Sequence, residues 1–160
     1  LHLFSREKQR FSPGSELPPV IDTPAGRVGL MICYDWFFPE VARMLALSGA
    51  QIVAHPANLV LDYCQKAMFA RCVENGIYAV TANRVGTETR AGRTVEFKGA
   101  SQVLDTQGRL LAGAPTCGEA VGVAAIDPAA AANKCVAPEA DLFGDRRPEF
   151  YGALAQPGRG

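Results

Sequence analysis

The sequence lacks the features that mark several large classes of protein. It has only two histidines, and its five cysteines include no C-x-x-C pair. We therefore expect neither a metal site with the short ligand spacing of zinc nor a framework of disulfides. No apolar run approaches the roughly 20 residues that span a membrane. The 16 basic and 16 acidic residues cancel, which gives no reason to expect nucleic acid or a membrane surface as a partner.

The N-terminus lacks the basic region followed by an apolar stretch that marks a signal peptide. We therefore expect a cytoplasmic protein whose thiols are reduced. The first residue is leucine rather than methionine, and we expect the chain to begin within a longer gene product.

Hydrophobic residues make up 48% of the chain, enough for one domain with one sizeable core. Apolar runs predict strands at 28–32, 51–54 and 77–82, and helices at 39–49 and 65–74. This alternation indicates an α/β fold with parallel strands, which need layers on both faces. We expect loops over 1–26 and 55–62, and antiparallel hairpins after Asn83.

Cys33 follows the first predicted strand and precedes the turn into the helix that Pro39 opens. Ligands bind at the carboxyl ends of strands in α/β sheets, and a tight strand-to-helix turn presents its side chain there. Cys33 is therefore the candidate nucleophile, with a buried structural cysteine as the alternative. Cys64 and Cys72 lie two turns apart on a predicted helix, so we expect them to be packing residues.

A thiol nucleophile needs a group that removes its proton, since its ordinary pKa is about 8.5. His55 follows the second predicted strand, so a dyad of Cys33 and His55 remains open. A Cys–His–Glu amidotransferase is not indicated, because Ile32 and Tyr34 flank the cysteine in place of glycines and no late histidine exists.

Five segments, in order along the chain, resemble the nitrilase superfamily of carbon–nitrogen hydrolases. They are G-L-M-I-C-Y-D-W-F-F-P-E at 29–40, H-P-A-N-L-V at 55–60, R-C-V-E-N-G-I-Y at 71–78, T-A-N-R-V-G at 81–86 and D-R-R-P-E at 145–149. The ordered set spans nearly the whole chain and is more specific than the cysteine segment alone. The resemblance implies an αββα sandwich, with residues 1–160 as the C-terminal part of a single domain.

The resemblance also implies a catalytic triad of Glu, Lys and Cys, in which Cys33 matches the cysteine. The family's lysine stands just before a stretch similar to Leu1-His2-Leu3-Phe4, and its glutamate lies further upstream. Lys8 and Glu16 do not match those positions, so we expect the 160-residue chain alone to be inactive. Glu7 matches a second glutamate of many members and is our second catalytic candidate, with a solvated loop charge as the alternative.

Four further residues are candidates for substrate binding under this resemblance: Tyr34, Asp35, Trp36 and Asn58. Trp36 could instead belong to the core, and Asn58 could only cap a loop. The nitrile-specific branch tends to show a C-W-E segment at the nucleophile. Here Tyr34 stands in place of the tryptophan and Asp35 in place of the glutamate, so the resemblance favours the amidase-like branches. It implies no metal and no organic cofactor.

Three functions remain open from the sequence. The first is hydrolysis of a non-peptide carbon–nitrogen bond, in a small amide or nitrile, through a cysteine thioester. The second is acyl transfer to an amine by the same superfamily, and the third is an interaction module without catalysis. The family also implies a homodimer or a higher homo-oligomer, with the helix from Pro39 and the tail 145–151 as the candidate contacts.

Overall fold

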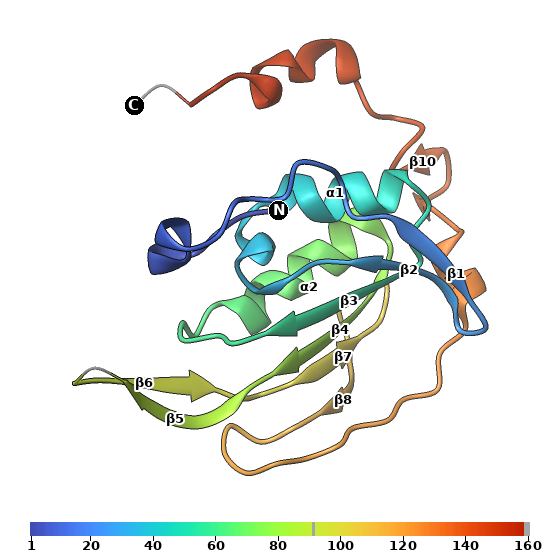
Figure 1. Cartoon of the computed structure of the whole chain (residues 1–160). Coiled ribbons are helices and arrows are strands. Elements are labelled where there is room, and N and C mark those ends of the chain that lie inside the picture. Colours follow the sequence, from blue (N-terminus) through green and yellow to red (C-terminus); the bar gives the residue numbers. More distant parts are fainter. Residues whose placement is uncertain (91, 159–160) are drawn as a thin grey trace.

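The computed structural model describes residues 1–90 and 92–158. Its centre is a six-stranded sheet in the order β1-β2-β3-β4-β7-β8 (Figure 1). The strands are β1 (Val20–Thr23), β2 (Gly26–Leu30), β3 (Ile52–Ala57), β4 (Tyr78–Asn83), β7 (Gln102–Leu104) and β8 (Leu110–Gly113). Strands β2, β3 and β4 are parallel, as predicted, and the outer strands pair antiparallel.

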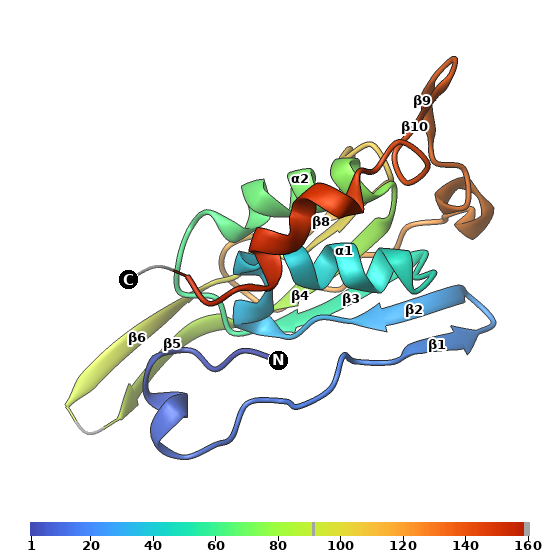
Figure 2. The same ribbon diagram turned by 90° about the horizontal axis from the view of Figure 1, so that it is seen from above.

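Two helices, α1 (Pro39–Leu47) and α2 (Cys64–Asn75), lie together on one face of this sheet (Figures 1 and 2). Their buried side chains, which include Leu45 and Met68, form the core against the sheet. Cys64 and Cys72 are fully buried there, which confirms the prediction that they are packing residues. The described residues thus supply one helical layer and one sheet layer, so helices cover one face only and not both.

Two parts of the chain differ from the prediction. Residues 20–23 form strand β1 rather than a loop, and pair with β2 across a tight turn. This strand is at the sheet edge and mostly exposed, so it lacks an apolar run that could reveal it. Strand β3 continues through Pro56 to Ala57, beyond the last residue that pairs with β2, which is Ala54. Proline is tolerated there because only β4 remains as a neighbour.

The predicted hairpins after Asn83 are present. Strands β5 (Val85–Arg90) and β6 (Arg93–Lys98) form a separate projecting hairpin, and β7 and β8 extend the main sheet. A short pair, β9 (Cys135–Ala137) with β10 (Ala140–Asp141), precedes the C-terminal tail. Four 3-10 segments complete the description: η1 (Ser5–Gln9), η2 (Cys33–Phe37), η3 (Pro128–Ala131) and η4 (Pro148–Ala155). None of the described helices is long and apolar enough to cross a membrane.

Candidate active site

Cys33 lies at a sharp turn directly after β2. Met31 still donates its backbone N–H to the carbonyl of Ala54 on β3, at 3.0 Å, and Cys33 then begins η2. The φ angle of Cys33 is +44°, in the left-handed region that residues with a Cβ rarely adopt. The half-buried thiol is thereby presented at the carboxyl end of the parallel strands, as the sequence predicts.

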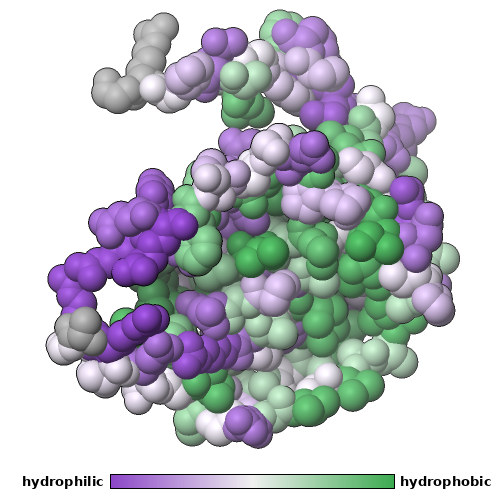
Figure 3. All heavy atoms as spheres, viewed as in Figure 1, coloured by the Kyte–Doolittle hydropathy of each residue, from purple (hydrophilic) through white to green (hydrophobic). Residues whose placement is uncertain are grey.

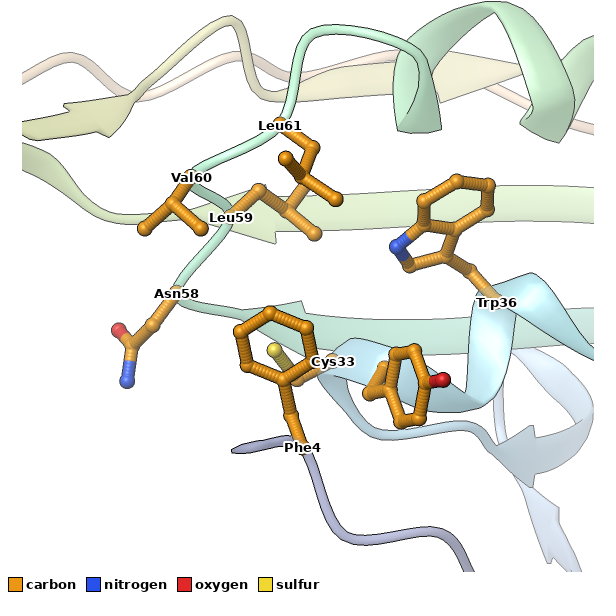
Figure 4. Close-up of a pocket in the computed structure, with 8 residues that line it drawn as sticks. Phe4, Cys33, Trp36, Asn58, Leu59, Val60 and Leu61 are labelled. Carbon is orange, nitrogen blue, oxygen red and sulfur yellow. The ribbon is translucent and has the colours of Figure 1, made fainter. Parts of the chain in front are cut away.

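A pocket opens in front of this thiol (Figure 4). Its walls come from the N-terminal segment, from η2 and from the loop that follows β3. They are formed by Phe4, Cys33, Tyr34, Trp36, Asn58, Leu59, Val60 and Leu61. The structure therefore brings three predicted binding residues, Tyr34, Trp36 and Asn58, into one pocket with Cys33. Their binding roles remain predictions.

The aromatic side chains of the pocket wall contact other aromatic rings. The ring centroids of Phe4 and Tyr34 lie 5.1 Å apart, and Trp36 lies 4.5 Å from the ring of Phe37, which is outside the pocket. Trp36 is buried, so it belongs to the core as well as to the pocket wall. Sequence reasoning did not identify Phe4 as a pocket residue, because its contact with Tyr34 joins positions 30 residues apart.

Asp35 does not line this pocket, although the sequence suggested a substrate contact. Its buried carboxylate accepts hydrogen bonds from four nitrogens: the backbone N of Leu1 at 3.0 Å, the backbone N and ring Nδ1 of His2 at 2.8 Å each, and the backbone N of Ile32 at 3.2 Å. Burial alone would raise the pKa of Asp35, but the hydrogen bonds from His2 and Ile32 outweigh it and lower that pKa. Asp35 thus ties the N-terminal segment to the nucleophile turn.

Glu7, the second catalytic candidate, is exposed on η1 and is not among the residues that line the pocket. Its Oε2 accepts a hydrogen bond from the backbone N of Phe4 at 2.8 Å. Glu7 therefore supports the segment that carries Phe4 into the pocket wall. A direct catalytic role for Glu7 stays a prediction.

His55 is completely buried and contacts Cys33 through the backbone, not through the thiol. Its Nε2 lies 3.0 Å from the carbonyl oxygen of Cys33, and its Nδ1 lies 3.2 Å from the hydroxyl of Thr81. Burial lowers the pKa of His55, which favours the neutral ring. Both ring nitrogens are occupied, so the structure does not support a base that takes a proton from Cys33.

Two polar side chains behind the pocket hold its walls. Asn83 accepts a hydrogen bond from the backbone N of Leu59 at 2.8 Å and donates to the carbonyl of Gly99. Arg71 donates to the backbone carbonyl of Trp36 at 3.3 Å and forms an ion pair within α2 with Glu74 at 3.1 Å. Among residues 1–90 and 92–158, no three His, Cys, Asp or Glu side chains are grouped so that they could hold a metal ion.

Known carbon–nitrogen hydrolases resemble this chain along most of its length. The family model described as carbon-nitrogen hydrolase matches residues 1–134. A protein named nitrilase, from Pyrococcus abyssi (strain GE5 / Orsay), is 48% identical over 151 residues, which are 94% of this chain and 56% of that protein.

Two solved structures are similar as well. A carbon-nitrogen hydrolase from Helicobacter pylori G27 matches with a TM-score of 0.82 and 29% identity, over 94% of this chain and 56% of that one. A mutant of the amidase from Nesterenkonia sp. AN1 that carries acrylamide at its active-site cysteine matches with a TM-score of 0.74 and 30% identity, over 95% and 54%.

The chain therefore spans about half the length of the proteins it matches. The matched structures have the nitrilase fold, which confirms the α/β sandwich that the sequence motifs imply. Together with the strained cysteine turn and its pocket, these similarities show that the chain belongs to the carbon–nitrogen hydrolase family.

Proposed function

We propose that the protein hydrolyses a non-peptide carbon–nitrogen bond in a small amide or nitrile, with Cys33 as the nucleophile. The observation that carries the proposal is the position of Cys33. It stands at a left-handed turn at the carboxyl end of β2, in a pocket with Tyr34, Trp36 and Asn58. An active-site cysteine modified by acrylamide in a similar amidase supports the same role.

In the proposed reaction with an amide, the Cys33 thiol loses its proton to a glutamate and the thiolate attacks the carbonyl carbon. The carbon–nitrogen bond then breaks, the nitrogen leaves as ammonia or an amine with the transferred proton, and a thioester remains. Water hydrolyses the thioester to the acid and restores the thiol. We propose that the glutamate, and the lysine that stabilises the negative oxygen, match residues of the family outside these 160.

We propose that the substrate is an amide rather than a nitrile. The support is the segment Cys33-Tyr34-Asp35, which departs from the C-W-E pattern of the nitrile-specific branch. In the structure, Tyr34 forms part of the pocket wall, whereas Asp35 accepts hydrogen bonds from the N-terminal segment. The pocket is mainly apolar and aromatic, which suits a small and uncharged acyl group.

The test uses the intact protein that carries this chain, assayed with short aliphatic amides, carbamoyl amines and nitriles. Cys33→Ala should lower kcat by more than about 10³-fold, because a nucleophile is lost, and should leave the far-UV circular dichroism unchanged. Cys117→Ala, at an exposed cysteine, is the matched control and should retain full activity. Normal turnover by Cys33→Ala would refute the proposal, and preferential transfer of the acyl group to an added amine would indicate an acyltransferase instead.

A further inference from the structure

We propose that His55 is a positioning residue for the nucleophile. Its ring, held by Thr81, donates a hydrogen bond to the carbonyl of Cys33 and keeps that residue in the left-handed conformation that presents its thiol to the pocket. The inference rests on the proposed role of Cys33 and adds to it. It assigns a function to the buried histidine that the reaction itself does not use.

The partners of His55 settle which ring nitrogen carries the proton. The carbonyl oxygen of Cys33 can only accept a hydrogen bond, so Nε2, 3.0 Å away, must be the donor. In the neutral ring Nδ1 is then an acceptor, and the hydroxyl of Thr81, 3.2 Å away, donates to it. A chain of two hydrogen bonds therefore runs from Thr81 through the ring to the backbone of the nucleophile.

The chain of hydrogen bonds crosses neighbouring elements of the sheet. Thr81 is the direct register partner of His55 in the parallel pairing of β4 with β3, and Cys33 follows β2 on the other side. His55 and Thr81 are 1% and 2% exposed, respectively. Buried side chains in two paired strands have little freedom, so the Nε2 donor is fixed relative to the sheet.

The backbone of Cys33 needs such a support. A residue with a Cβ is disfavoured at a φ of +44°, and such conformations persist only where surrounding contacts impose them. A return of φ to a negative value would swing the thiol away from the space beside Phe4 and Asn58 (Figure 4). Misplacement of a reacting atom by about 1 Å can cost about 100-fold in rate.

The experiment compares two variants of His55 in the intact protein. His55→Phe keeps a planar ring of similar size but has no donor for the Cys33 carbonyl. His55→Gln keeps a side-chain N–H donor and a side-chain acceptor. The first readout is kcat and KM for the amide substrate. The second is the rate at which iodoacetamide alkylates Cys33, followed by mass spectrometry. That rate is divided by the rate for a small thiosulfonate that reacts with any accessible thiol, and the quotient is called the alkylation ratio.

We expect His55→Phe to lower kcat by about 10- to 100-fold with KM changed less, and to lower the alkylation ratio in the same direction. His55→Gln should recover most of both. Equal loss in the two variants would overturn the proposal, because it would mean that the imidazole itself is required. An unchanged alkylation ratio in folded His55→Phe would also overturn it.

Thr81→Val provides a second route if His55→Phe does not fold. It keeps the imidazole but removes the hydroxyl that orients it, so the alkylation ratio should fall by several-fold. A ratio equal to that of the unmodified protein would contradict the proposal. The alkylation ratio needs no turnover, so a failure to find hydrolysis would count against the proposed function without deciding the role of His55.

Discussion

Two buried polar side chains flank the nucleophile turn and act on different parts of its backbone. His55 bonds to the carbonyl of Cys33, whereas Asp35 gathers backbone N–H groups from Ile32 and from the segment 1–2. The ring of His2 adds a contact, since it stacks on Phe38 with the centroids 3.6 Å apart. The turn is therefore fixed from both sides by hydrogen bonds that only the fold brings together.

We predict that Asp35→Asn destabilises the protein by about 2 kcal/mol. In asparagine an NH2 group replaces one carboxylate oxygen. This donor would face backbone N–H groups that now donate to the carboxylate, so at least one of those N–H groups would lose its acceptor. Urea unfolding measures the change. Asp22→Asn is the matched control, because the Asp22 side chain is 87% exposed and pairs with Arg27 at the surface. It should change stability by less than about 0.5 kcal/mol.

The same carboxylate predicts a pH dependence. The pKa of Asp35 is lower in the folded protein than its ordinary value of 3.8. A lowered folded-state pKa stabilises the fold above the ordinary pKa, and this stabilisation disappears as the pH falls through the folded-state pKa. Stability should therefore decline below about pH 4, and Asp35→Asn should decline less steeply. Parallel acid transitions in the two proteins would contradict this.

Among single residues, the sequence predicted which side chains gather at the pocket better than it predicted their individual contacts. Cys33, Tyr34, Trp36 and Asn58 meet in one pocket because they follow two neighbouring parallel strands, which a pattern of apolar runs can reveal. The sequence could not show that Asp35, unlike Tyr34 and Trp36, points away from the pocket. The direction of its side chain depends on contacts with residues 1 and 2, which lie far from it in the sequence.

At the scale of elements, the boundaries of the two helices and three parallel strands lie within a few residues of the prediction. Pro39 starts α1 as predicted, and Gly76 ends α2, two residues beyond the predicted helix. The carboxylate of Asp127 accepts the backbone N–H of Ala129 and caps the short segment η3, which holds part of an alanine run. Edge strand β1 was missed because it buries little, so no periodicity marks it.

The end of α2 gives a prediction about the stability of that element. Gly76 has a φ of +57°, and an added Cβ would meet Leu142 and Lys134 only at 3.4 Å. Strain in the backbone rather than a collision should therefore decide the effect, and Gly76→Ala should cost about 1 kcal/mol. Thermal unfolding measures it. Gly76→Asn should cost less, because asparagine tolerates this conformation, and a Gly76→Ala variant as stable as the original would refute the prediction.

For the whole molecule, the described residues leave two surfaces uncovered. On the sheet face away from the helices, the side chains of Val80, Ala112 and Val121 border an open groove. Figure 3 shows hydrophobic side chains spread over this part of the molecule, whereas hydrophilic residues gather at the end formed by η1 and the β5–β6 hairpin. The family's αββα architecture predicts a second sheet on this face, which the sequence motifs implied but the described residues do not supply.

The second uncovered surface is the C-terminal tail. In Figure 1, η4 runs above α1 and apart from the sheet, and in Figure 2, seen from above, it overlies the helical layer. Phe150 and Leu154 are 70% and 68% exposed, and Met44 and Leu47 of α1 are also exposed on the facing helix. Apolar side chains on a projecting segment favour contact with another surface, which is consistent with the dimer contacts that the family resemblance implies.

We predict that the intact protein forms a homodimer in which α1 and the tail are buried. An isologous contact would use the same patch on both subunits, and a stable one buries about 1,200–2,000 Å² in total. Light scattering at micromolar concentration should give twice the mass of one chain.

The double variant Phe150→Asp with Leu154→Asp places two charges in the contact and should shift the protein toward a monomer. Val95→Asp, on the exposed β6 strand, is the control and should leave the dimer intact. A monomeric unmodified protein would refute the prediction, and a dimer that persists in the double variant would place the contact elsewhere.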